Sequence, residues 1–242
     1  MNNRTGRKWA CVLGILLGVS GVWAASPEVF WDDFNDGLWN GIKWKKATWD
    51  DGNFRETGGR CLFYDNGGAG FQVSGWSANF DRVYNGLDYL DIQATVRVPH
   101  KIKGGDGSYE VGLGLYESRP LHNYVELTVR DKVDGRFFVI FYWNGVAGVH
   151  KEFAYPAPAT LNAYRIRIYY SASTDKVNFF WAPVGSTAWT KIRSGLSMQT
   201  MFNRTVPHTM RPYFVGYMSL VQVPETWNVY VDDFIAVYRD LP

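Results

Sequence analysis

Two copies of one tripeptide could bind a metal ion. Asp32-Asp33-Phe34 lies near the start of the chain and Asp232-Asp233-Phe234 near its end, each in an alternating, aromatic-rich run typical of half-buried strands. If the two strands lie side by side and antiparallel, the chain closes its own sheet and brings two carboxylate pairs together. A Ca²⁺ ion would relieve their repulsion, because Asp side chains and backbone carbonyls supply the oxygen ligands it takes. The alternative is that each Asp only caps a turn.

The first 24 residues have the composition of a secretory signal peptide. Three basic residues precede an apolar run from Trp9 to Val22, which is too short to span a membrane, and Ala24 follows as a small residue before a cut. We therefore expect residues 1–24 to be removed and residues 25–242 to form one secreted domain, extracellular or periplasmic. A retained membrane anchor is the alternative.

The charge of the chain excludes some partners. The chain has 25 Lys and Arg and 23 Asp and Glu, and three of the basic residues lie in the leader. The mature chain then has a formal net charge of −1, so total charge gives no reason to expect binding to nucleic acid or to an anionic membrane.

Cys61 is the one cysteine that remains after cleavage, so we expect no internal disulfide. It lies in the strand-like run Arg60 to Tyr64, where a buried thiol would act as a small apolar side chain. The four histidines are scattered and carry no signature of a base for a catalytic thiol.

Alternation of apolar and polar residues predicts strands throughout the chain. Val111, Leu113 and Leu115 would share one face of a strand, and Val125, Leu127 and Val129 would share one face of the next. Asp134-Gly135 and Asn144-Gly145 are typical hairpin turns. Only Leu196 to Met201 is a candidate for a short helix. The sequence therefore predicts an all-β fold, a two-sheet antiparallel β-sandwich or jelly roll.

Three segments together resemble the concanavalin A-like lectin/glucanase superfamily. They are Trp31-Asp32-Asp33-Phe34-Asn35-Asp36-Gly37, the pair Gly112-Leu113-Gly114-Leu115 and Asn123-Tyr124-Val125-Glu126-Leu127, and Asp232-Asp233-Phe234-Ile235-Ala236-Val237-Tyr238. Within that superfamily the chain looks most like the laminin G-like, non-enzymatic branch. The motifs are short and aromatic, so they specify a fold better than an activity.

The resemblance implies a structural calcium site. In the laminarinases and lichenases of this superfamily, an Asp in the last strand binds Ca²⁺ together with two backbone carbonyls. By position these ligands correspond here to Asp233, Asp33 and Gly59. The ion would hold the two ends of the chain together rather than take part in catalysis.

The same resemblance gives little support for hydrolysis. Retaining glucanases of this fold carry Glu-x-Asp-x-x-Glu, because one carboxylate attacks while another, about 5 Å away, donates a proton. Here the corresponding segment reads Glu126-Leu127-Thr128-Val129-Arg130, which lacks the Asp and the second Glu. The alginate-lyase pattern is matched only faintly by Tyr213-Phe214-Val215-Gly216-Tyr217. We therefore assign no catalytic residue.

Aromatic and charged side chains fall on the faces opposite the expected core. Sugars stack their C–H faces on aromatic rings and pair their hydroxyls with planar polar groups. The candidate ligand-binding residues are Tyr116, Tyr124, Glu126, Arg130 and Arg167, placed together on one face, and Trp143, at a strand end where a rim loop would present it. Trp181 and Trp189 are further candidates at strand ends, although aromatic residues are also what strands prefer in their cores.

These observations favour a secreted, non-catalytic β-sandwich that binds a polysaccharide or another surface polymer, with a structural Ca²⁺ near its ends. A polysaccharide hydrolase or lyase of the same fold is an alternative, as is a structural or adhesive surface module. Asn203-Arg204-Thr205 matches a glycosylation acceptor.

Overall fold

Alternation along the central segments produces strands whose apolar residues face a single interior. The computed structural model describes residues 27–35, 44–46, 53–64, 72–78, 82–84, 88–117, 123–145, 147–203 and 208–239. The expected leader and most of the Asn203 acceptor triplet lie outside these residues. Within them, no helix has the length and apolar character needed to cross a membrane.

Strands dominate the described residues. In chain order they are β1 (Glu28–Asp32), β2 (Trp44–Lys46), β3 (Asn53–Glu56), β4 (Cys61–Tyr64), β5 (Gln72–Ala78), β6 (Arg82–Tyr84), β7 (Tyr89–Arg97), β8 (Ser108–Glu117), β9 (Tyr124–Lys132), β10 (Gly135–Asn144), β11 (Val149–Pro156), β12 (Ala163–Ser171), β13 (Lys176–Pro183), β14 (Thr190–Leu196), β15 (His208–Ser219) and β16 (Val229–Arg239). The short helix α1 (Met198–Phe202) confirms the predicted helical segment, and a 3-10 turn, η2 (Glu225–Trp227), precedes β16.

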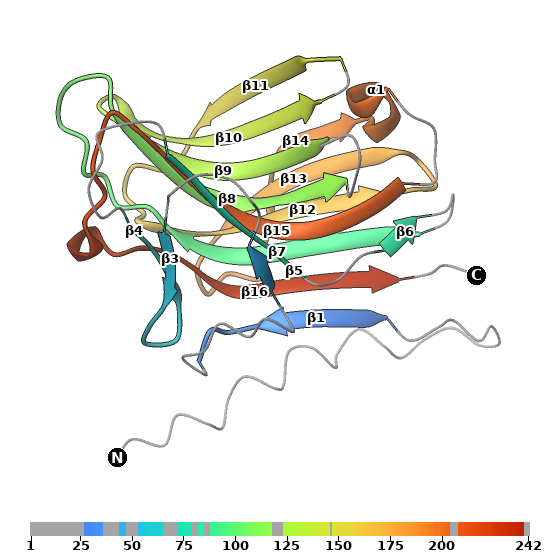
Figure 1. Ribbon diagram of the computed structural model, residues 1–242, viewed down its shortest axis with the longest axis horizontal. Coiled ribbons are helices and arrows are strands. Elements are labelled where there is room, and N and C mark those ends of the chain that lie inside the picture. Colours follow the sequence, from blue (N-terminus) through green and yellow to red (C-terminus); the bar gives the residue numbers. More distant parts are fainter. Residues whose placement is uncertain are drawn as a thin grey trace.

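The described strands form two antiparallel sheets of eight strands each (Figure 1). Sheet A has the order β14-β13-β12-β7-β16-β4-β3, with β1 also paired to β16. Sheet B has the order β11-β10-β9-β8-β15-β5-β2, with β6 also paired to β15. The predicted two-sheet sandwich is therefore confirmed.

The core lies between the two sheets. Leu113 and Leu127 of sheet B belong to the same buried cluster as Ile92 and Ile166 of sheet A. Their neighbours in sequence consequently point outward, so each sheet has one outer face.

The first and last described strands are neighbours, as the sequence predicts. β1 pairs antiparallel with β16, with Asp32 opposite Phe234. We also expected this pairing to close the sheet, and that expectation is wrong. The strand order of sheet A ends at β14 on one side and at β3 on the other, so the sheet stays open. An eight-stranded sheet that packs on a second one needs no closure, because its apolar face is already covered.

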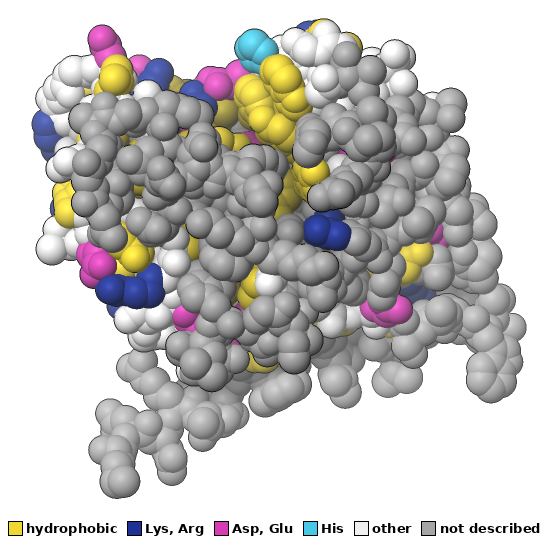
Figure 2. Space-filling model, in the orientation of Figure 1, with side chains coloured by type: hydrophobic (Ala, Val, Ile, Leu, Met, Phe, Trp, Pro, Cys, Tyr) yellow, Lys and Arg dark blue, Asp and Glu magenta, His cyan; other side chains and the backbone are white. Residues whose placement is uncertain are grey.

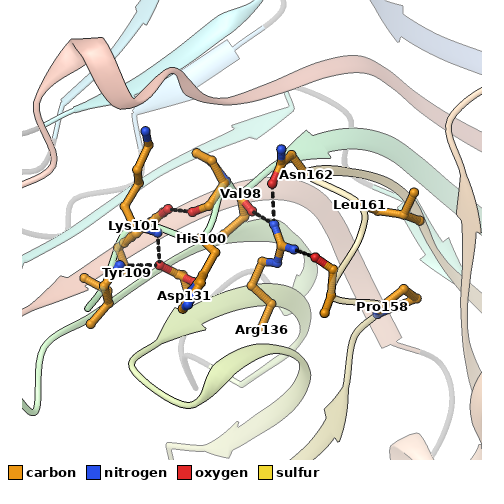
Figure 3. Close-up of polar contacts among 12 residues, drawn as sticks. Val98, His100, Lys101, Tyr109, Asp131, Arg136, Pro158, Leu161 and Asn162 are labelled. Atoms are coloured by element: carbon orange, nitrogen blue, oxygen red, sulfur yellow. Dashed lines mark hydrogen bonds and ion pairs between the residues drawn. The ribbon is translucent and has the colours of Figure 1, made fainter. Parts of the chain in front are cut away.

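Polar side chains fix one end of the sandwich (Figure 3). Asp131 accepts hydrogen bonds from the backbone N–H groups of Lys101 at 2.8 Å and Ile102 at 2.9 Å, and Nδ1 of His100 lies 2.6 Å from it. Arg136 donates to the carbonyl of Val98 at 3.3 Å and to Oδ1 of Asn162 at 2.5 Å. These buried groups satisfy loop backbone atoms, so the cluster holds loops in place.

Cys61 is a buried free thiol, as predicted. Burial raises the pKa of Cys61 well above its ordinary value. The thiolate, which is the reactive form, is therefore suppressed.

Candidate functional site

Glu126 lies at the centre of the outer face of sheet B. Its neighbours Val125 and Leu127 point into the core, so its own side chain points outward on β9. The hydroxyl of Tyr213 donates to Glu126 at 2.5 Å, and that of Tyr217 lies 2.6 and 2.8 Å from its two oxygens. Glu126 is only 1% exposed, so it lies below the surface of this face. Its hydrogen bonds fix the positions of the two tyrosines of β15.

A glycine makes this arrangement possible. In the register of sheet B, Gly114 of β8 lies between Tyr213 and Glu126. A Cβ atom on Gly114 would come within 2.6 Å of the Tyr213 ring, so only glycine leaves room for that ring to cross β8. The Gly-x-Gly run of the sequence thus shapes the site, whereas its signal in the sequence was only a resemblance to a fold.

Burial makes Glu126 a weak acid. It raises the pKa of Glu126 to about 7, while the hydrogen bonds from Tyr213 and Tyr217 act in the opposite direction. Nearby Glu110 raises the pKa and Arg130 lowers it. The carboxyl group therefore changes its charge near neutral pH.

A second carboxylate of this face is paired with a cation. Arg130 donates to Oε1 of Glu110 through Nε at 2.9 Å and Nη2 at 2.8 Å, and the Thr128 hydroxyl donates to the other oxygen of Glu110. Arg130 also reaches Glu152 of β11, with contacts of 2.7 and 3.0 Å. One guanidinium thus bridges two carboxylates. We call Glu110, Glu126, Arg130, Glu152, Tyr213 and Tyr217 the carboxylate network.

Four rings continue this face toward its edge. Centroid distances are 5.8 Å for Tyr124 and Phe141, 6.0 Å for Phe141 and His150, and 5.9 Å for His150 and Trp143. Each ring plane lies within 32° of the next. These residues, the aromatic row, cross β9, β10 and β11. In Figure 2, hydrophobic side chains gather beside a histidine at the edge of the molecule where β10 and β11 lie.

The predicted ligand-binding residues fall on two opposite sides of the molecule. Tyr116, Tyr124, Arg130 and Trp143 are partly exposed on the outer face of sheet B. Arg167 lies on β12 of sheet A, so its predicted place on the same face is wrong. Alternation fixes which side of a strand a residue occupies, but it does not tell to which sheet the strand belongs.

Of the two further tryptophans, Trp181 differs from expectation, whereas Trp189 lies just before β14, at a strand end as predicted. Trp181 packs against Phe138, with a centroid distance of 5.3 Å, and joins the core instead of a rim. Trp189 lies against Arg165 of sheet A, 4.6 Å from its guanidinium. Neither belongs to the aromatic row.

Sequence reasoning missed Phe141 and His150. Phe141 shares its parity with Trp143 on β10, and β11 pairs with β10 so that His150 is opposite Trp143. The Asn144-Gly145 turn pointed to this hairpin, but β11 is an exposed edge strand with little alternation and was not predicted.

The predicted metal residues meet at one junction in sheet A. Pairing of β1 with β16 ends at Asp32 and Phe234, and pairing of β4 with β16 ends at Cys61 and Val231. Asp33, Gly59 and Asp233 therefore lie where these two pairings end. Asp233 has a left-handed backbone, with φ 49°, at an irregularity in the β16–β7 register.

Asn35 also belongs to this junction. A Cβ atom on Gly59 would come within 2.4 Å of its Oδ1, and its amide donates to Asp33. The possible donors are all oxygen atoms, which suits Ca²⁺. No group of three or more His, Cys, Asp or Glu side chains placed to hold a metal occurs in the described part of the chain, so backbone and amide oxygens would have to complete the ligand set.

No family model matches the sequence, and no curated protein matches it either. Solved structures do resemble it. The CBM2 module of the evolved Dit of Lactobacillus casei BL23 phage J-1 has a TM-score of 0.61 at 14% identity, over 89% of this chain and 97% of that one. Winged bean acidic lectin with methyl-α-D-galactose gives 0.58 at 8% identity, over 90% and 100%. A putative β-glucanase of Mycobacterium abscessus gives 0.51 at 13% identity, over 87% and 98%. The chain therefore has the concanavalin A-like β-sandwich fold of these structures.

Proposed function

We propose that this protein is a secreted, non-catalytic β-sandwich that binds a polysaccharide on the outer face of sheet B. The observation that carries the proposal is the aromatic row, which lies directly beside the carboxylate network. Rings offer stacking surface to the C–H faces of a sugar, and a guanidinium with carboxylates offers paired hydrogen bonds to its hydroxyls. Solved structures of this fold include lectins complexed with galactose and its methyl derivative, which supports a sugar as the ligand.

The residues of this face divide into contacts and supports. Phe141, Trp143 and His150 have exposed ring surface and would contact the ligand. Glu152, whose side chain is 41% exposed, would accept hydrogen bonds from hydroxyl groups. Glu126 would act from below by fixing Tyr213 and Tyr217. This division into contacting and supporting residues fits a non-enzymatic, laminin G-like protein, because no buried group of the carboxylate network needs to take part in catalysis.

Binding to a panel of soluble neutral polysaccharides tests the proposal. Affinity electrophoresis of the wild type should show retardation by at least one polymer. A Phe141→Ala/Trp143→Ala variant should bind about ten-fold more weakly, because aromatic anchors carry much of the energy of such interfaces. Trp189→Ala, on the opposite face, is the matched control and should bind as the wild type does. Equal binding by all three proteins, or silence across the panel, would count against the proposal and favour a structural or adhesive module.

We further propose that Ca²⁺ binds at the junction of β1, β4 and β16. Asp33, Gly59 and Asp233 would hold it, with Asn35 beside them. The ion would link the first and last strands of the mature chain through atoms that otherwise repel one another. Its effect would be on stability.

A thermal melt with and without a chelator tests the calcium site. A ligand that binds only the folded state raises the melting temperature, so the chelator should lower it and added Ca²⁺ should restore it. Asp233→Asn should reduce the response to Ca²⁺. Asp106→Asn, in an exposed loop far from the junction in sequence, is the control. Identical melting curves with chelator and with Ca²⁺ would remove the site.

One observation favours a second candidate, a glycoside hydrolase. Glu126, with its pKa raised to about 7, could donate a proton at neutral pH, and a second carboxylate, Glu110, lies on the same face. Hydrolysis of a bound polysaccharide that is abolished in Glu126→Gln would establish this reading. Glu126 is enclosed by two tyrosines and Glu110 is occupied by Arg130 and Thr128, so we rank binding first.

A further inference from the structure

A second group of rings and charges lies on the outer face of sheet A. Ile166 and Ile168 of β12 are buried in the core, so Arg165 and Arg167 point to the other side. Arg167 is opposite Phe180 of β13, and Phe180 is opposite Lys191 of β14. A row of cation, ring and cation therefore crosses three neighbouring strands.

Trp189 completes this group. Its ring centroid lies 4.6 Å from the Arg165 guanidinium and 5.6 Å from that of Arg167. The Phe180 centroid lies 5.5 Å from the Arg167 guanidinium and 5.9 Å from Nζ of Lys191. We call these five residues the basic-aromatic cluster. Stacking against rings holds the guanidinium planes in fixed orientations, so less freedom is lost when they bind a ligand.

The basic-aromatic cluster keeps an excess of positive charge. Asp91 binds Arg167 through two contacts of 2.8 and 2.6 Å. Arg165 donates instead to neutral oxygens, the carbonyl of Ser186 at 2.6 Å and the amide of Gln93 at 3.3 Å. Lys191 is exposed and forms no ion pair among the described residues. Of the three cations, only Arg167 is therefore paired with a carboxylate among the described residues.

The nearly neutral total charge of the chain does not reveal this local excess of positive charge. The carboxylate network of sheet B has three carboxyl groups and one guanidinium, and Arg211, which is opposite Tyr116, adds a second cation to that face among the described residues. An acidic polymer would therefore be attracted to the basic-aromatic cluster more than to the carboxylate network at low ionic strength. We therefore treat the basic-aromatic cluster as a candidate binding site separate from the carboxylate network.

We propose that the basic-aromatic cluster is a second binding site, for a polysaccharide that carries carboxylate groups. A planar guanidinium pairs with a carboxylate through two parallel hydrogen bonds, while the ring between two cations receives the C–H face of a sugar. The small local excess suits a polymer with one acidic group per sugar. It is too small to match the dense phosphates of nucleic acid or a broad anionic membrane.

Affinity electrophoresis of the whole secreted chain in polygalacturonate tests this proposal. The control polymer is the same chain of sugars with its carboxyl groups methyl-esterified, which removes the charge and keeps the rings. The wild type should be retarded by polygalacturonate only, and retardation should weaken as salt is added. A Lys191→Gln/Arg165→Gln variant should bind about ten-fold more weakly, equivalent to about 1.4 kcal/mol.

A control variant and a single substitution show whether the position of the lost charges matters, or only their number. Lys132→Gln/Lys151→Gln removes the same two charges from exposed positions on sheet B and should bind as the wild type does. Lys191→Gln alone alters an exposed side chain, so it keeps the fold and should still weaken binding. Thermal melts of all variants report whether each is folded.

Several outcomes would overturn the proposal. These are equal retardation by the esterified polymer, equal loss in the sheet B control, and undiminished binding by the cluster variants. Stronger binding of single-stranded DNA or of phosphatidylserine vesicles, lost in the cluster variants, would assign the cluster to those ligands instead. Loss of neutral-polysaccharide binding in Phe141→Ala/Trp143→Ala is a separate result, because those residues lie on the other sheet.

Discussion

The two outer faces of this sandwich are built in the same way and differ in charge and burial. Each has aromatic rings beside charged side chains and an arginine held by a carboxylate, as in Arg130 with Glu110 and Arg167 with Asp91. On sheet B, Arg130 bridges the carboxylates of Glu110 and Glu152. On sheet A, the one carboxylate, Asp91, binds Arg167 and leaves Arg165 and Lys191 without a carboxylate partner among the described residues. Similar ring content can therefore serve two ligands of different charge.

Burial separates the two faces further. Glu126 is 1% exposed and Glu110 is 7% exposed, whereas Lys191 of sheet A is exposed. A buried charge needs its partners, because the cost of leaving it unpaired falls on the folded state. Substitution of the buried carboxyl groups of sheet B should therefore lower stability, whereas substitution of Lys191 on sheet A should lower binding with little effect on folding.

The same substitution at the two arginines gives the largest expected difference. Arg130→Met leaves the buried carboxylate of Glu110 without its cation and should lower the free energy of unfolding by about 3–5 kcal/mol. Arg167→Met removes the cation of one carboxylate, Asp91, which keeps the amide of Gln93 at 3.3 Å, whereas Arg130 serves both Glu110 and Glu152, so the loss should be smaller, about 1–3 kcal/mol. Urea unfolding of both variants measures the two losses. Equal losses would show that the charges of the two faces contribute alike to stability.

Glu126→Gln should change how stability depends on pH. The pKa of Glu126 in the folded protein, about 7, lies above its ordinary value of 4.5, so the folded state binds more protons than the unfolded state between these values. The free energy of unfolding should therefore fall as pH rises through this range, by about 3 kcal/mol from this group alone. The glutamine variant has no carboxyl group and should lack this decline.

The measurement is the difference between wild-type and variant stability from pH 4.5 to above 7. Glu152→Gln, which alters an exposed carboxylate of the same face, is the matched control and should keep the wild-type decline. A wild type that becomes more stable relative to Glu126→Gln as pH rises would show that Glu126 is ionised in the folded protein throughout the range.

Sequence alternation predicted the sandwich because the central strands have one buried side and one polar side. Val111, Leu113 and Leu115 are all fully buried, as expected. The pairing of β1 with β16 was also predicted, from two alternating, aromatic-rich runs that carry the same tripeptide, which begins at the last residue of β1 and lies within β16. The edge strands β11 and β14 were not predicted, since strands that bury little show weak alternation.

The site was predictable only in part. Tyr116, Tyr124, Glu126 and Arg130 lie on one face because each is separated from the next by a strand period or by one hairpin. Arg167 follows the same period, but sheet membership depends on pairings between distant segments, which no local pattern reports. Glu126 is hydrogen-bonded to Tyr213 and Tyr217, which lie about 90 residues away in sequence. Strand β8 separates β15 from β9, so only the register of sheet B brings these residues together.

Gly114→Ala should distort the carboxylate network without touching sheet A. The new Cβ atom would force the Tyr213 ring away from Glu126, and overpacking of this kind costs about 1–3 kcal/mol. Binding to neutral polysaccharide should weaken and binding to polygalacturonate should not. Gly104→Ala is the control, because a Cβ atom there would meet no neighbour within 4 Å, and its stability should change by less than about 0.5 kcal/mol. Retention of neutral-polysaccharide affinity in Gly114→Ala would show that Tyr213 does not shape the binding face.

Tyr217→Phe should give the smallest effect and tests whether Glu126 is tuned by its tyrosines. The Tyr217 hydroxyl stabilises the ionised form of Glu126 and lowers its pKa, so its removal should move the pH midpoint of Glu126 upward from about 7. The loss of stability should be about 1 kcal/mol above the midpoint and smaller below it, where the carboxyl group is protonated and the hydrogen bond is weaker. Tyr169→Phe makes the same change on the outer face of sheet A, away from Glu126, and should leave the midpoint unchanged. Tyr213 still donates to Glu126 in the variant. A midpoint that does not move would therefore mean that Tyr213 alone stabilises the ionised carboxylate. The face would then depend on one hydrogen bond, although the structure shows two.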